Sequence, residues 1–95
     1  MADKIIRQRW RFEGNVQGVG FRVSTKAISA RFDVVGFVRN NVDGTVTVEA
    51  EGRALILNSF LSEIRSQLAT RIDHCVKEDI AAVTGSGAEA AFVIR

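Results

Sequence analysis

Residues 14–22, with the sequence GNVQGVGFR, contain the side chains and spacing best suited to chemistry. Three glycines, Gly14, Gly18 and Gly20, fall within seven positions at the junction of a predicted strand and a predicted helix. Such glycines let the main chain bend tightly and turn several N–H groups toward an anion. Arg22 is a cation in the first turn of the predicted helix, where the helix dipole disfavours it. A bound anion would reverse that cost, so the stretch predicts a phosphate or other oxyanion site.

Asn40, at the end of the second predicted strand, is the other candidate for this site. The sequence does not fix its distance from Arg22, so two interpretations stay open. Asn40 either takes part in the site or is a turn residue before Asn41, since asparagine is common in turns. Arg22 has an alternative role too, as an ordinary surface arginine.

Other catalytic and cofactor motifs fail. A Walker loop needs a Gly-Lys-Ser/Thr string that the chain lacks, and a dinucleotide fingerprint needs a third glycine where Val23 stands. His74 and Cys75 are the only histidine and cysteine, and on a strand they would point to opposite faces, so we expect both to be structural. We expect no metal site, since the sequence shows no cluster of metal-ligating residues.

The residue pattern also predicts the elements that must position the loop. Alternation predicts strands at 4–13, 34–40, 45–51 and 71–83, with a short strand at 91–94. Helical periodicity predicts helices at 21–32, closed by Asp33 in the left-handed conformation, and from Gly52, which breaks the strand pattern, to about Leu68. Asp43-Gly44 predicts a hairpin between the two middle strands, and composition predicts a loop at 84–87. The order β-α-β-β-α-β is the split βαβ plan, an α+β sandwich with two helices on one face of an antiparallel sheet.

The two faces of the first strand differ in character. Trp10 and Phe12 are expected to face the core, together with Ile6 and Gln8. Arg7, Arg9 and Arg11 alternate with them on the other face. We expect that face to be in water, as is common for antiparallel sheets, and consider a binding stripe the weaker interpretation.

Composition sets the class of protein. Its 95 residues, 46% hydrophobic and 25% charged, predict one globular domain over residues 1–95. A net charge of +2 is too small to argue for nucleic acid. No membrane span, secretion signal or internal disulfide is expected, so a cytoplasmic setting is the default.

Two long motifs carry a resemblance to a known family. GNVQGVGFR at 14–22, with Thr25 beyond it, resembles the acylphosphatase signature, and GFVRNNVDGTVTVEAEG at 36–52 is similar to the second signature of that family. The resemblance covers essentially the whole chain and implies a ferredoxin-like βαββαβ sandwich. It also implies hydrolysis of small acyl phosphates to a carboxylate and inorganic phosphate by a monomer, without cofactor, metal or covalent intermediate. Arg22 would bind the phosphate and Asn40 would orient the attacking water. The loop N–H groups would cradle the phosphate, and they belong to Asn15, Val16, Gln17, Gly18, Val19 and Gly20. Thr25 falls near the site without a catalytic role.

Two other functional classes remain open. The chain could be a non-catalytic anion-binding or regulatory module that keeps the loop but has lost turnover. It could also be an RNA-binding domain on the same fold, which would stack bases on aromatic side chains of the open sheet face. Phe37 is the only aromatic expected on that face, so the RNA interpretation is weak.

Overall fold

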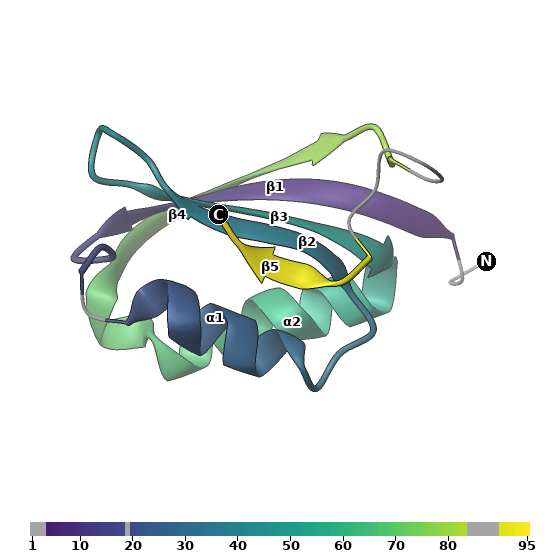
Figure 1. The fold of residues 1–95 in the computed structure, drawn as a ribbon, viewed down its shortest axis with the longest axis horizontal. Coiled ribbons are helices and arrows are strands. Elements are labelled where there is room, and N and C mark those ends of the chain that lie inside the picture. Colours follow the sequence, from purple (N-terminus) through teal and green to yellow (C-terminus); the bar gives the residue numbers. More distant parts are fainter. Residues whose placement is uncertain (1–3, 19, 84–89) are drawn as a thin grey trace.

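The computed structural model describes residues 4–18, 20–83 and 90–95. In this part of the chain, two helices lie on one face of a five-stranded sheet (Figure 1). In chain order the elements are β1 (Ile5–Gly14), α1 (Phe21–Ser29), β2 (Val35–Asn40), β3 (Val46–Arg53), α2 (Ala54–Gln67), the 3-10 helix η1 (Ala69–Arg71), β4 (Ile72–Ile80) and β5 (Phe92–Ile94). The predicted split βαβ sandwich with a short extra strand is therefore confirmed. The loop predicted at 84–87 lies outside the described residues. No helix in the described segments is long and apolar enough to cross a membrane.

The sheet has the strand order β4-β1-β3-β2-β5 and contains one parallel pair. β1 pairs antiparallel with β3 and β4, and β2 with β3, but β5 runs parallel to β2. The expectation of a purely antiparallel sheet is thus wrong at this edge. β4 ends with Ile80 beside Arg7, and β5 begins with Phe92 beside Gly36. Both positions lie at the same end of the sheet, so β5 leaves that end in the direction of β2.

The core lies between the sheet and the helices. The faces of α1 and α2 that point toward the sheet are buried. Phe60 of α2, which lies at the centre of an aromatic cluster, has no exposed surface. Its ring lies 5.6 Å from that of Trp10, 5.8 Å from Phe32 and 5.4 Å from Phe92. Each large apolar side chain buried in this way contributes about 1.5–3 kcal/mol to folding. The core thus joins α2, β1 and β5, and fixes the sheet on which the loop and Asn40 are placed.

Helix α1 ends at Ser29, three residues before the predicted end. The N–H groups of Ala30, Arg31 and Phe32 each donate to the carbonyl three residues earlier, which tightens the chain into turns. The predicted left-handed cap at Asp33 is wrong, because no described residue other than glycine has a positive φ. Phe32 still packs against the core, which explains why the apolar pattern reached that far.

The prediction that the outer face of β1 lies in water is wrong at Arg7. This side chain is only 3% exposed, and its guanidinium pairs with Glu49 at 3.1 Å and Glu51 at 3.4 Å. The Glu51 carboxylate also accepts a 2.6 Å hydrogen bond from the N–H of Val83, in the chain that follows β4. The alternation of residue types distinguished the two faces of β1. It could not show that the segment at Val83 lies against one of them.

The β2–β3 hairpin is confirmed, and it determines where Asn40 lies. The N–H of Asn41 donates to Thr45 O at 2.8 Å, and Gly44, with φ of +92°, donates to Asn41 O at 3.2 Å. The Asp43 carboxylate accepts from the hydroxyl and the N–H of Thr45, at 2.6 and 3.0 Å. These hydrogen bonds lower the pKa of Asp43 below its ordinary value.

Two strands differ from their predicted bounds. β3 continues through Gly52, where the sequence predicted a break, and β4 is shorter than predicted.

Candidate active site

The glycine loop connects the end of β1 to the start of α1. Gly14, Gly18 and Gly20 have φ values of +130°, +85° and +83°, a region that other residues avoid. Gly20 precedes the first helical residue, and its carbonyl accepts the first helical hydrogen bond, from Ser24 N at 2.8 Å. No described side chain caps this end of α1, and its first turn contains no acidic residue. The N–H groups and the positive end of the dipole therefore remain available to an anion.

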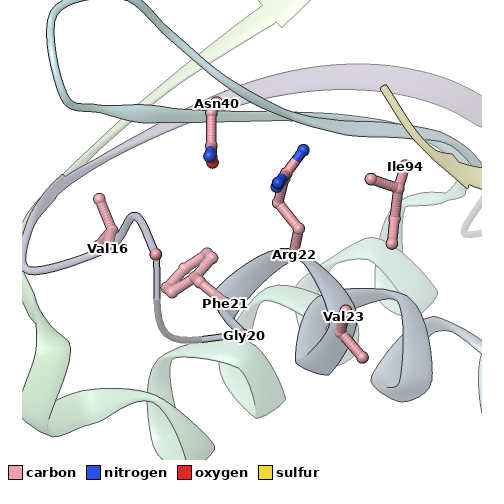
Figure 2. A pocket seen from close by; sticks show the side chains of 8 residues that line it. Val16, Gly20, Phe21, Arg22, Val23, Asn40 and Ile94 are labelled. Atoms are coloured by element: carbon pink, nitrogen blue, oxygen red, sulfur yellow. The ribbon is translucent and has the colours of Figure 1, made fainter.

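A pocket of about 230 Å³ lies directly beside this helix start. Figure 2 shows the side chain of Arg22 rising from α1 and that of Asn40 descending from β2 into the same space. The described residues that line the pocket are Val16, Gly18, Gly20, Phe21, Arg22, Val23, Asn40 and Ile94. The fold thus brings Arg22 and Asn40 together, which the sequence left open.

Neither Arg22 nor Asn40 makes a short side-chain hydrogen bond or ion pair with a described residue. Arg22 Nη1 lies 3.5 Å from the main-chain oxygen of Arg95, the limit for a hydrogen bond. Among the described residues, Arg22 makes no ion pair with an Asp or Glu side chain, and the carboxamide of Asn40 makes no hydrogen bond to protein. Both side chains are half-buried. A cation and a carboxamide with free hydrogen-bonding capacity therefore face one polar space.

The remaining loop residues differ in their relation to the pocket. Val16 is fully buried and anchors the loop in the core, whereas Asn15 is exposed and does not line the pocket. Val19 lies outside the described residues. Gln17 turns its side chain away from the pocket, and Nε2 donates to Asn41 O at 2.6 Å and Thr45 O at 2.8 Å.

Sequence reasoning missed three contributions to this region. It assigned only the main chain of Gln17, although the side chain ties the loop to the hairpin. It also missed Val23 and Ile94, which add apolar surface to the pocket. Val23 directly follows Arg22 and could have been suspected, but Ile94 reaches the pocket only because β5 pairs with β2.

His74 and Cys75 lie on opposite faces of β4, as predicted. Cys75 is opposite Phe12 and packs against the core, whereas His74 is opposite Glu13 and is exposed. Burial raises the pKa of the Cys75 thiol, which keeps it protonated. Neither residue lines the pocket at the loop, and no group of three or more His, Cys, Asp and Glu residues in the described segments could hold a metal ion.

Phe37, the aromatic residue expected on the outer sheet face, is covered. It is 4% exposed, and the guanidinium of Arg95 lies 4.4 Å from the centre of its ring, with that of Arg39 at 5.4 Å. The ring is therefore not open to stack on a nucleic acid base, which argues against the RNA-binding interpretation.

Comparison with known proteins agrees with this geometry. The sequence model of the acylphosphatase family matches residues 8–94. The chain belongs to the acylphosphatase family. An acylphosphatase from Ligilactobacillus salivarius is 53% identical over 53 residues, which span 56% of this chain and 59% of that relative, less than two thirds of its length. An acylphosphatase from Nitratidesulfovibrio vulgaris strain DP4 is 40% identical over 74 residues, which span 77% of this chain and 74% of that relative.

The fold agrees with a solved acylphosphatase as well. The crystal structure of acylphosphatase from Bacillus subtilis superposes with a TM-score of 0.81 at 25% identity, over 97% of this chain and 99% of that chain. The similarity thus extends from β1 to β5. The ferredoxin-like fold that the resemblance implied is confirmed for this acylphosphatase-family chain.

Proposed function

We propose that this protein is an acylphosphatase that hydrolyses the carboxyl–phosphate bond of small acyl phosphates to a carboxylate and inorganic phosphate. Family membership supports this activity. The observation that supports the site is that Arg22 and Asn40 enter one pocket at the glycine-rich start of α1. This arrangement supplies a cation, a carboxamide and unpaired N–H groups, which suit phosphoryl transfer.

In this proposal the phosphoryl group of the substrate lies between the loop and Arg22. The main-chain N–H groups of the glycine loop cradle its oxygens, with Gly18 and Gly20 at the pocket wall. The planar guanidinium of Arg22 donates two parallel hydrogen bonds to two phosphate oxygens. Charge that develops on the phosphoryl oxygens in the transition state is stabilised by these donors.

Asn40 orients the attacking water. The water oxygen bonds to phosphorus while the bond between phosphorus and the carboxylate oxygen breaks, and the electron pair leaves with the carboxylate. The proton of the water passes to a phosphate oxygen, since no carboxylate lines the pocket among the described residues. The carboxylate is a weak base, because the pKa of a carboxylic acid is about 4. It can therefore leave without being protonated. The proposal therefore assigns no step to a general acid or a covalent nucleophile.

We also propose that residues 1–95 act as one domain and as a monomer in the cytoplasm. The substrate is a small molecule that fits a pocket of about 230 Å³. The described residues that line the site come from the loop, α1, β2 and β5 of one chain, which is compatible with a monomer.

Hydrolysis of benzoyl phosphate, with and without a chelator, tests the function. We expect turnover that the chelator does not change, and a loss of about a hundredfold or more in kcat for Arg22→Ala and for Asn40→Ala. Arg65→Ala and Asn58→Ala remove the same side-chain types from the exposed surface of α2 and serve as matched controls. Near-normal turnover in the first two variants would overturn the site. Phosphate binding without any turnover in the wild type would instead favour the non-catalytic module.

A further inference from the structure

We propose that Val23 and Ile94 form an apolar shelf that binds the acyl group, and that the preferred substrates are therefore acyl phosphates with an apolar acyl group. This inference rests on the proposed function, because it divides the same pocket into a phosphoryl end and an acyl end. The term apolar shelf refers below to these two side chains only.

The first observation is that both side chains are apolar, solvent-exposed and part of the pocket wall. Val23 is 65% exposed and Ile94 is 39% exposed, and both line the pocket that holds Arg22. They come from different elements, α1 and β5, and β5 lies beside the pocket because it pairs with β2. The other apolar lining residues, Val16 and Phe21, are at most 1% exposed and belong to the core.

The second observation is the direction of the pocket. In Figure 2, Arg22 separates Val23 and Ile94 on one side from Asn40 and Val16 on the other. In phosphoryl transfer the attacking and leaving oxygens lie roughly in line through phosphorus. If Asn40 holds the water on its side of phosphorus, the leaving carboxylate lies on the side away from Asn40. In Figure 2 the apolar shelf also lies away from Asn40, beyond Arg22.

The third observation is that the described lining residues at this end of the pocket, Val23 and Ile94, are both apolar. Of the described lining residues, Arg22 alone is charged, and it is assigned to the phosphoryl group. The nearby Lys26 donates its Nζ to Phe92 O at 2.9 Å. A charged acyl group would pay the free-energy cost of desolvation at the shelf without forming an ion pair there. A phenyl or alkyl group would instead be stabilised by the burial of its apolar surface.

The test compares two substrates in variants that change polarity more than shape. Val23→Thr is nearly isosteric, and Ile94→Thr keeps a β-branched side chain in the strand. We compare kcat/KM for benzoyl phosphate and acetyl phosphate, because the ratio between variant and wild type cancels the different reactivity of the two substrates. The matched control is Leu55→Thr with Val76→Thr, which have similar exposures, 62% and 40%, on α2 and β4.

We expect the benzoyl-to-acetyl ratio of kcat/KM to fall about five- to tenfold in the Val23→Thr/Ile94→Thr double variant, chiefly through KM. Inhibition by inorganic phosphate should change less than twofold, because phosphate occupies the other end. The control pair should leave the ratio unchanged. An unchanged ratio in the double variant, with both substrates still hydrolysed, would overturn the shelf and leave the proposed function standing. A wild type that hydrolyses neither substrate would overturn both.

Discussion

The side-chain amide of Gln17 lies 2.6 Å from the main-chain oxygen of Asn41, and the same nitrogen lies 2.8 Å from the oxygen of Thr45. One side chain thus joins the glycine loop to the hairpin that begins immediately after Asn40. Although Gln17 does not line the pocket, we expect this connection to set the distance between the loop N–H groups and the Asn40 carboxamide.

Replacing Gln17 by Glu should therefore impair the site while keeping the size of the side chain. The carboxylate would face two carbonyl oxygens, so two hydrogen bonds would become repulsive contacts. We expect stability to fall by about 1–3 kcal/mol and kcat/KM for benzoyl phosphate to fall about tenfold as the loop shifts from Asn40. The two carbonyl oxygens would raise the pKa of this carboxyl above its ordinary value of about 4.3. On acidification the protonated carboxyl could donate one hydrogen bond again, so the ratio of variant to wild-type activity should rise.

Gln67→Glu is the matched control for this change. Gln67 is exposed on the last turn of α2 and donates to Glu63 at 2.8 Å, far from the loop in sequence. It should leave kcat/KM unchanged. Wild-type activity in Gln17→Glu, or a loss with no pH dependence, would contradict the positioning role of Gln17.

Arg22→Lys separates the charge of Arg22 from its shape. Lysine keeps the positive charge but lacks the planar fork that binds two phosphate oxygens. We expect kcat to fall at least tenfold, since the second hydrogen bond is lost as charge develops in the transition state. Inhibition by inorganic phosphate should weaken less than in Arg22→Ala. Equal inhibition constants for the two variants would show that charge at this position does not contribute to phosphate binding.

Gly14→Ala and Gly20→Ala should affect stability and activity differently. A Cβ on Gly14 would lie 2.4 Å from Arg71 O and 2.7 Å from Asp73 N, so β1 and β4 would have to separate. A Cβ on Gly20 would meet no atom within 4 Å, and the cost is the left-handed φ of +83° alone, about 1–2 kcal/mol. Urea unfolding should show the larger loss for Gly14→Ala. Gly20→Ala should lose less stability than Gly14→Ala but still lose activity, because it alters the loop at the pocket. The reverse order of stabilities would contradict this account.

Much of the fold followed from local pattern. The apolar stripes of α1 and α2, the strand alternation and the Asp43-Gly44 turn all produced elements near their predicted places. These signals are local, because each depends on neighbours within one or two turns or strand repeats. The predicted end of α1 lies beyond the observed end. The reason is that Phe32 continues the apolar pattern after the hydrogen bonds have changed to the shorter spacing of three residues.

The features that the sequence did not reveal depend on contacts between distant segments. The parallel pairing of β5 with β2 joins segments that are far apart in the sequence, and it carries Ile94 to the pocket. The burial of Arg7 depends on carboxylates of β3. Arg22 and Asn40 were both singled out from the sequence, but only the sheet order brings them to one space. Their chemical roles remain proposals that the variants above test.

The ion-pair network on the outer sheet face predicts how stability depends on pH. Burial raises the pKa of the Glu49 carboxyl, but hydrogen bonds from Arg9 and Arg7 outweigh it, so that this pKa lies below its ordinary value. The Arg7 contact is 3.1 Å and the Arg9 contact is 2.8 Å. A carboxyl with a lowered pKa in the folded state stabilises the protein above its unfolded pKa, about 4.3. That contribution is lost as the pH falls through the folded pKa, because the folded state must then take up a proton.

We therefore expect the free energy of unfolding, measured with urea, to fall as the pH decreases below about 4.5, and to fall less steeply in Glu49→Gln. At pH 7 this variant should be about 2–3 kcal/mol less stable, since the nearly inaccessible guanidinium of Arg7 loses a charged partner. Glu13→Gln is the control, because Glu13 forms an exposed ion pair with Arg11 at 3.3 Å, and such pairs contribute about 0–1 kcal/mol. Equal pH profiles for wild type and Glu49→Gln would mean that Glu49 is not the group responsible, and that the acid sensitivity arises elsewhere on the sheet.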